Sequence, residues 1–303
     1  MTDSKPQSKT DAADAGRGKG ALAALDAWVN EGEWQVRLLP FVFYVAFLIV
    51  ISAAVSALSV VAYPFLYVFQ CGVVLWLLWR YRAKLTELNW KFHWSALPTG
   101  IGLMFAWVWL GQWMSDLAPM FDYSGEVHDF DKMAAIESAG GQAVYWSSIS
   151  LRLLGMSLVV PMLEELFTRS LCLRTLHSWK ATWLGLKQVA YDLPGIGDWF
   201  MKTKAGAEAS KQPPAFVTEY ARTKLGDVSL FAIGATTLVF MLSHAMRDWP
   251  GCIACGVVWC LMVKWTNREG GKQLGLGPVV WSHGITNAAL WVYCYMVGSW
   301  EFL

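Results

Sequence analysis

The sequence predicts an all-α fold, a polytopic transmembrane bundle of about seven spans. Hydrophobic residues make up 55% of the 303 residues and charged residues only 16%, whereas soluble domains carry about a quarter. The mean hydropathy is +0.37. The chain has 19 tryptophans, and tryptophan concentrates where membrane meets water. This composition, with a formal net charge of +1, argues against a disordered chain, a nucleic-acid-binding protein and most soluble enzymes.

The N-terminal region, residues 1–37, precedes the first predicted span. Residues 1–20 are small, polar and without hydrophobic periodicity, so we expect a disordered tail. No apolar stretch of the kind found in a cleavable signal peptide follows the early lysines. Residues 21–37 fit an amphipathic helix lying at the membrane interface, and a plain soluble linker helix fits them equally well.

The next region, 38–144, is expected to hold accessory transmembrane helices. Leu38–Trp79 contains no charged residue and is long enough for two spans of about 20 residues, with a short connector near Ser56–Pro64. A third span is expected over about 97–114. The loop that follows is acidic, and its carboxylates are Asp116, Asp122, Glu126, Asp129, Asp131 and Glu137.

The remaining region, 145–303, is expected to form the functional core. Its first span, Leu153–Leu173, is followed by a polar and basic insertion at about 175–227. Pro-Gly and Pro-Pro pairs mark turns within this insertion. Three more spans are expected after it, over about 228–246, 249–263 and 276–296.

The charges of the loops predict an orientation. Lysine and arginine concentrate in the N-terminal tail, the loop after the second span, the insertion and the loop after the sixth span, whereas the alternate loops are bare or acidic. Positive loops stay in the cytoplasm. We therefore expect a cytoplasmic N-terminus and a C-terminus on the outer side.

The six cysteines are not spaced as a disulfide framework. Cys252 and Cys255 form a C-x-x-C pair, but a zinc or redox centre normally needs a second ligand pair or a soluble βαβ setting. Neither is visible in the sequence, so the cysteines are interpreted as small apolar packing residues.

The fourth predicted span carries three charged residues: Glu164, Glu165 and Arg169. A charge near the bilayer centre costs about 3 kcal/mol on insertion scales. Glu165 and Arg169 are i, i+4 neighbours and can pair, whereas Glu164 points about 100° away and has no partner on its own helix. Glu164 is therefore a candidate general base, and the alternative is an interhelical ion-pair network that only holds the bundle.

Two further pairs in apolar spans have i, i+4 spacing, which places both members of a pair on one helix face. They are Phe240 with His244 and His283 with Asn287. A lone membrane histidine often only hydrogen-bonds between helices, but these groups together with the charges of the fourth span indicate a shared site. The other histidines are expected to be solvated: His93, His128 and His177.

These residues fall into three short motifs, E-E-x-x-x-R at Glu164–Arg169, F-x-x-x-H at Phe240–His244 and H-x-x-x-N at His283–Asn287. In this order, on separate predicted spans, they resemble the motifs of the CPBP family, the CAAX-protease and bacteriocin-processing family of intramembrane glutamate proteases. The resemblance covers about residues 145–303. The C-terminal segment 283–303 further resembles the CAAX-protease-related proteins of bacterial exosortase systems.

The resemblance implies an intramembrane endopeptidase that acts on a membrane-associated protein or its C-terminal tail. It implies that Glu164 is the general base that activates a water molecule, and that His244 holds or shares this water. His283 and Asn287 would stabilise the oxyanion of the tetrahedral intermediate. Peptide hydrolysis needs both a deprotonated water and donors at the developing oxyanion.

The resemblance also implies roles for the supporting residues and for partners. Glu165 and Arg169 would position the site or meet the substrate backbone, and Phe240 would support it. No metal and no cofactor are expected. The expected partners are membrane lipid, a peptide or membrane-protein substrate and an exosortase-system protein, with no nucleic acid, in the bacterial inner membrane.

Two other functions stay open from the sequence. Glu164, His244 and His283 could ligate a catalytic zinc ion, since one carboxylate with two imidazoles is a known set. A non-catalytic membrane scaffold or accessory factor in protein sorting would keep the motifs for structure alone.

Two features of this sequence depart from the family pattern. A long insertion separates the first two motifs, and counting residues along the predicted spans places His244 nearer the outer surface than Glu164.

Overall fold

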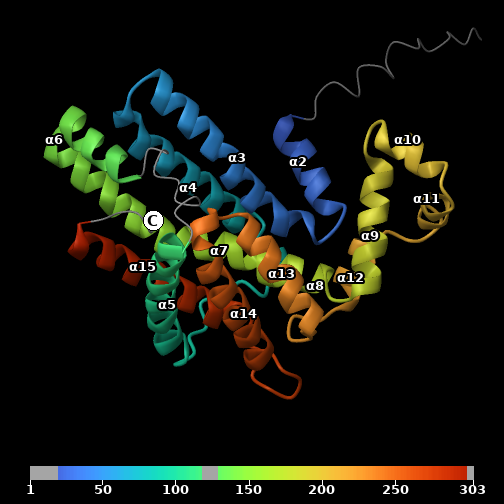
Figure 1. The fold of residues 1–303 in the computed structure, drawn as a ribbon. Helices are drawn as coiled ribbons and strands as arrows, with labels where there is room; N and C mark the ends of the chain where they lie inside the picture. Colours follow the sequence, from blue (N-terminus) through green and yellow to red (C-terminus); the bar gives the residue numbers. More distant parts are fainter. Residues whose placement is uncertain (1–19, 118–128, 299–303) are drawn as a thin grey trace, which may run out of the picture.

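The computed structural model describes residues 20–117 and 129–298, and all of its regular elements are helices (Figure 1). No β-strand occurs within these two ranges, which confirms the predicted all-α class. Most of the predicted N-terminal tail, the middle of the acidic loop with His128, and the last five residues lie outside the described residues.

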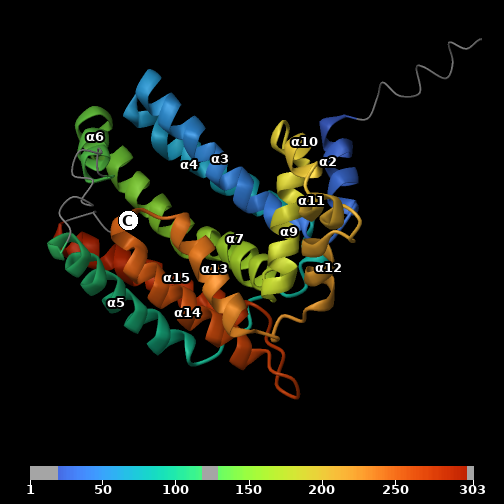
Figure 2. The same cartoon turned by 45° about the vertical axis from the view of Figure 1, so that its right-hand side comes forward.

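The predicted N-terminal hairpin is present. It consists of α3 (Gln35–Ala57) and α4 (Tyr63–Arg80), joined through the short 3₁₀ turn η1 (Val60–Ala62). The turn is capped by Ser59, whose hydroxyl accepts a hydrogen bond from the Val61 backbone N–H. The two helices lie side by side in Figures 1 and 2.

The amphipathic helix expected over 21–37 divides into two parts. Its first part is α2 (Ala21–Asn30), and the break before α3 contains Gly32, a poor helix former. Asp26 of α2 pairs with Arg80 of α4 at 2.5 Å. This contact ties α2 to the hairpin.

The C-terminal half of the bundle is built around α15 (Gly277–Val297). α15 packs against α5 (Ala96–Leu117) and α14 (Trp249–Thr266), and α14 packs against α13 (Leu230–Leu242). A Cβ atom at Gly100 of α5 would lie 2.7 Å from a backbone oxygen of α15. Only glycine permits this approach of two helices, a common device in membrane bundles.

The fourth predicted span is part of a much longer helical run, which has one kink at Gly141. The run consists of α6 (Asp129–Leu154), η4 (Gly155–Val159), α7 (Val160–Glu165), η5 (Leu166–Cys172) and α8 (Leu173–Thr175). Asp116 still belongs to α5, and the acidic segment is helical again from Asp129 onward, which corrects the loop expected there. η4 and η5 are π-helical, so the motif-bearing α7 lies between two widened turns. Such turns are rare and often occur at functional sites.

The insertion folds into four short helices that project from one end of the bundle (yellow and light orange in Figures 1 and 2). They are α9 (Trp179–Asp192), α10 (Ile196–Met201), α11 (Lys204–Ala209) and α12 (Ala215–Arg222). The Pro-Gly and Pro-Pro pairs fall between helices, as predicted. Ser178 begins α9 by accepting a hydrogen bond from a backbone N–H of the first turn.

Four stretches of the described residues are long and apolar enough to cross a membrane: Gln35–Ala57, Val60–Arg80, Ala135–Thr175 and Met246–Thr266. This is compatible with an integral membrane protein. α13 has only 13 residues, about 20 Å at 1.5 Å per residue, and is shorter than a hydrocarbon core of about 30 Å. The count of seven spans and the orientation remain predictions.

All six cysteines are buried and free. Cys252, Cys255 and Cys260 have no exposed surface and belong to the main apolar core. Their interpretation as packing residues is confirmed.

Candidate functional site

A cavity of about 850 Å³ lies within the bundle. The four residues expected to act in catalysis line it, together with the supporting aromatic residue: Glu164, His244, His283, Asn287 and Phe240. The hairpin α3–α4 forms another part of its wall. The helices predicted as accessory therefore shape the site.

The two adjacent glutamates of α7 have different surroundings. Glu164 reaches the cavity with 15% of its side chain exposed, whereas the Glu165 side chain has no exposed surface. The Oε2 atom of Glu164 lies 3.8 Å from Nε2 of His283. Consecutive helical residues point about 100° apart, so one carboxylate faces the cavity and the other faces the packed interior.

His283 lies between these two carboxylates. Its Nδ1 atom lies 2.7 Å from Oε1 of Glu165, and because an ionised carboxylate can only accept, Nδ1–H donates. This leaves Nε2 toward Glu164. The imidazole stacks on the Trp259 ring with centroids 4.2 Å apart. The sequence did not reveal the contact with Glu165, which joins positions 118 residues apart.

Asn287 lies one turn beyond His283 on α15. Its Nδ2 atom donates to the Met156 carbonyl oxygen at 2.7 Å, in the π-helical turn η4. An amide has two N–H donors, so one remains for another acceptor. A Cβ atom at Gly284 would lie 2.5 Å from the Ser157 carbonyl oxygen. Glycine at this position lets α15 approach η4 closely and fixes where Asn287 lies.

His244 lies just beyond the end of α13 rather than on a helix, which corrects the predicted fifth span. α13 ends at Leu242, and both the Ser243 hydroxyl and His244 Nδ1 donate to the Phe240 carbonyl oxygen, at 2.7 and 2.9 Å. The last carbonyls of a helix have no helical partner, so these side chains satisfy one. A neutral His244 then has an unprotonated Nε2.

Glu165 and Arg169 form the predicted pair. The Nε and Oε2 atoms lie 3.2 Å apart, and neither side chain has any exposed surface. The Arg169 guanidinium lies 4.7 Å from the Phe240 ring centroid and 5.2 Å from that of Trp259. Neither charged residue lines the cavity, so the arrangement favours positioning of His283 over contact with a substrate backbone.

Several cavity residues were missed from the sequence. Besides Trp259 they include Tyr44, Tyr63, Tyr67, Trp107, Arg152 and Asp248. Arg152 donates to the Tyr63 hydroxyl at 3.3 Å and lies on the same helical run as Glu164, about 18 Å earlier at 1.5 Å per residue. Tyrosine hydroxyls inside apolar spans were an available signal, whereas nothing distinguished Trp259 from the other tryptophans.

The structure also shows where His93 and His177 lie, and whether side chains that could ligate a metal ion are grouped together. His93 contacts Ser95 at 2.8 Å and is half-buried, and His177 lies 3.4 Å from Asp227, both away from the cavity. Within residues 20–117 and 129–298, no three His, Cys, Asp or Glu side chains are grouped to hold a metal ion.

No protein-family model, curated protein or solved structure matches the chain. The resemblance to the CPBP family remains a prediction that its three motifs carry.

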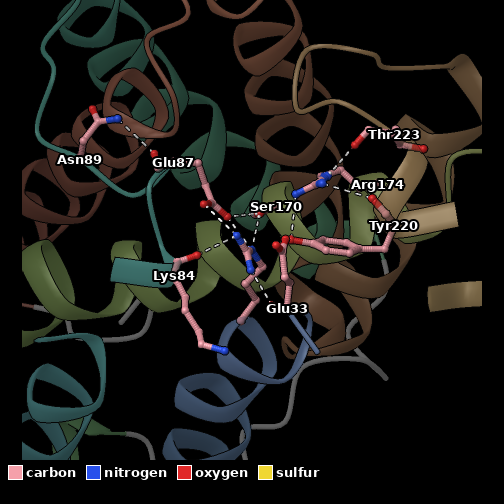
Figure 3. A network of polar contacts seen from close by, with 9 residues as sticks. Glu33, Lys84, Glu87, Asn89, Ser170, Arg174, Tyr220 and Thr223 are labelled. Carbon is pink, nitrogen blue, oxygen red and sulfur yellow. Dashed lines mark hydrogen bonds and ion pairs between the residues drawn. The ribbon is translucent and has the colours of Figure 1, made fainter. Parts of the chain in front are cut away.

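A second buried polar cluster lies near the other end of the helical run (Figure 3). We call it the end network, and it comprises Arg37, Glu87, Ser170, Arg174, Tyr220 and Thr223. Arg37 binds both carboxylate oxygens of Glu87, at 2.5 and 2.9 Å, and also donates to Ser170. Arg174 donates to the Tyr220 hydroxyl at 2.8 Å and to the carbonyls of Tyr220 and Thr223.

The end network connects four parts of the chain: α3, the loop after α4, the helical run at η5 and α8, and α12 of the insertion with the residue that follows it. Burial raises the pKa of Glu87, but hydrogen bonds from Arg37 and Ser170 outweigh burial and hold the pKa below its ordinary value. Burial raises the pKa of Tyr220 to about 12, so its hydroxyl remains a neutral hydrogen-bonding group. The network holds the insertion against the bundle.

Proposed function

We propose that the chain is an intramembrane endopeptidase of the glutamate type, which hydrolyses a peptide bond in a membrane-associated protein or its C-terminal tail. One observation carries this proposal. A carboxylate, two imidazoles and an amide line a single cavity within a largely apolar bundle: Glu164, His244, His283 and Asn287. Polar groups are expensive in such surroundings, and perturbed groups that converge in a cavity favour a chemical role.

In the first step, Glu164 acts as general base. It takes a proton from a water molecule while the water oxygen attacks the substrate carbonyl carbon and the carbon–oxygen π bond opens to an oxyanion. His244 accepts a hydrogen bond from the second hydrogen of this water at Nε2, the nitrogen left free by the bond to Phe240. General-base catalysis of this kind contributes about 10²–10⁴ in rate.

In the second step, two donors stabilise the oxyanion. Asn287 supplies its remaining N–H, and His283 supplies Nε2–H in its imidazolium form. Glu165 stabilises that imidazolium through Nδ1, and Arg169 holds Glu165. Glu164 then delivers its proton to the leaving nitrogen, the carbon–nitrogen bond breaks, and an acid and an amine are released.

The proposal has a cellular setting that follows from the motif resemblance and the loop charges. The chain would lie in a bacterial inner membrane with its N-terminus and its basic insertion in the cytoplasm. Its substrate would be a membrane-associated protein sorted by an exosortase system. Four long apolar helices agree with a membrane location.

The test is cleavage by the purified protein in lipid nanodiscs, with a library of membrane-anchored peptides as substrates and mass spectrometry of the products. We expect cleavage by the wild type, unaffected by a chelator, with activity lost on the acid side as Glu164 takes up a proton and can no longer act as a base. The matched control is Glu164→Gln, which keeps the size of the side chain and removes the base.

Three outcomes would contradict the proposal. Cleavage by Glu164→Gln at the wild-type rate would end the glutamate mechanism. Activity lost in chelator and restored by zinc would favour the metal-dependent alternative. A folded wild type that cleaves no library member and retains its binding to a sorting partner would favour the scaffold.

A further inference from the structure

One face of α9 in the insertion is apolar and exposed. We call this face the α9 stripe; it comprises Trp179, Trp183 and Leu186, whose exposed fractions lie between 49% and 60%. Their spacing of four and three residues places them on one side of a helix. The rings of Trp179 and Trp183 stack with centroids 5.8 Å apart. An exposed apolar face of this kind usually marks a binding surface.

The opposite face of α9 is already used by the insertion. A Cβ atom at Gly185 would lie 2.5 Å from the Phe216 ring, so α12 packs directly there. Gln188 donates to the Pro213 carbonyl at 3.0 Å and accepts from the Ala215 N–H at 2.8 Å. The orientation of α9 is therefore fixed, and the stripe faces outward.

Lysines border the stripe. Lys180 is exposed, and Nζ of Lys187 lies 5.5 Å from the Trp183 ring centroid. On a helix both lie roughly 80–100° from Trp179, which places them along one edge. Tryptophan flanked by lysine is typical of helices at the level of lipid headgroups, where the lysine stem covers apolar surface and its charge meets the headgroups.

The stripe continues the outer surface of the bundle. α9 starts just after Thr175, where a candidate membrane span ends, and in both views it turns away from the line of α7 and α8 (Figures 1 and 2). The Trp179 ring meets the Phe231 ring edge-on at 5.6 Å. Leu230, next to Phe231, is 86% exposed.

We propose that the α9 stripe docks the insertion on the surface of an anionic lipid bilayer. Tryptophan and leucine enter the headgroup region, while Lys180 and Lys187 bind lipid phosphates. Since the end network joins α12 to the bundle and α12 packs on α9, the docked insertion fixes the end of the helical run relative to the membrane. This inference does not depend on peptidase activity.

The test is a fluorescent label on a cysteine introduced at either of two exposed positions of α9. Leu186→Cys lies within the stripe, and Asp192→Cys is the matched control on another face of the same helix. The full-length protein is placed in nanodiscs of phosphatidylcholine, with or without phosphatidylglycerol, that contain a lipid with a nitroxide near the headgroup. Quenching by this lipid is measured at each position.

We expect strong quenching at Leu186→Cys, weak quenching at Asp192→Cys, and an increase at the first position with phosphatidylglycerol that high salt reverses. Changing both Lys180 and Lys187 to Gln should lower the ratio of docked to undocked protein about 25-fold, at about fivefold per lysine near an anionic surface. Equal quenching at both positions would overturn the proposal. A label at Leu186→Cys that is shielded from aqueous iodide but not quenched by the lipid would overturn it too, since protein would then cover the stripe. Quenching that phosphatidylglycerol leaves unchanged would refute the anionic-lipid preference.

Discussion

Two buried polar clusters share one helical run, and they differ in how fully their polar atoms are paired. In the end network, Nε, Nη1 and Nη2 of both Arg37 and Arg174 all donate hydrogen bonds. The second cluster, which we call the cavity cluster, comprises the cavity-lining Glu164 and His283 and the Glu165–Arg169 pair behind them. In it, Nε and Nη2 of Arg169 and Oε2 of Glu165 have no hydrogen bond within the described residues, although the two side chains form an ion pair.

This difference indicates different tasks. A buried polar atom without a hydrogen bond costs about 1–3 kcal/mol, so natural structures keep few of them and often at functional sites. The end network minimises this cost and holds helices together. In the cavity cluster these unpaired atoms lie next to His283, whose interactions would change in the proposed mechanism.

The largest expected effect on folding comes from Arg169→Ala. Removal of this guanidinium leaves the buried Glu165 carboxylate without its ion pair, and the loss of one partner of a buried pair costs about 3–5 kcal/mol. We expect less folded protein in membranes and a lower thermal midpoint. Wild-type yield and thermal stability would show that the pair is dispensable, and Arg169→Met, which keeps much of the length, separates loss of charge from loss of packing.

The next effect in size is on turnover alone. Asn287→Ala should lower kcat by about 10²–10³, the usual effect of one oxyanion donor, and leave KM nearly unchanged because the donor acts in the transition state. Asn287→Asp keeps the size but removes the donor, so it should lose at least as much. Peptide cleavage rates across substrate concentration measure both. An increase in KM with unchanged kcat would assign Asn287 to substrate binding instead.

The sequence predicted a substantial part of this arrangement. The charge-free stretch predicted both hairpin helices. The three motifs predicted five residues that line the cavity, four of them polar. The contact of His283 with Glu165 was not predictable, because i, i+4 spacing reports only neighbours on one helix. The sequence also could not show that α13 ends at Leu242, since Ser243 and His244 could equally have continued the helix, whereas in the structure their side chains bond to the Phe240 carbonyl oxygen at its end.

A smaller effect is expected from acid on the end network. The folded-state pKa of Glu87 lies below its ordinary value, about 4.3 for a glutamate. The stabilisation is therefore complete above that ordinary value and is lost as the pH falls through the folded-state pKa. Thermal midpoints measured from pH 6 downward should fall less steeply for Glu87→Gln than for the wild type. If the thermal midpoints of the two proteins fall equally steeply with pH, Glu87 does not contribute to the loss of stability in acid.

The smallest effect is expected at the more exposed ion pair between Asp26 and Arg80, whose side chains are about a third exposed. The hydrogen bond from Arg80 lowers the pKa of Asp26, but solvent screens such pairs strongly. Asp26→Asn should change the thermal midpoint much less than Glu87→Gln does. An equal change in the thermal midpoint would mean that the Asp26–Arg80 pair stabilises the fold as much as Glu87 does.

The central claim is that the cavity cluster performs chemistry while the end network holds the fold, and one paired measurement tests it directly. Thermal stability and peptide cleavage per folded molecule are compared for Glu164→Gln and Glu87→Gln in the same nanodiscs. We predict that Glu164→Gln keeps its stability and loses turnover by about 10²–10⁴. Glu87→Gln should lose about 3–5 kcal/mol of stability and keep the turnover of its folded fraction. Unchanged turnover in Glu164→Gln, or lost turnover at full stability in Glu87→Gln, would contradict the account.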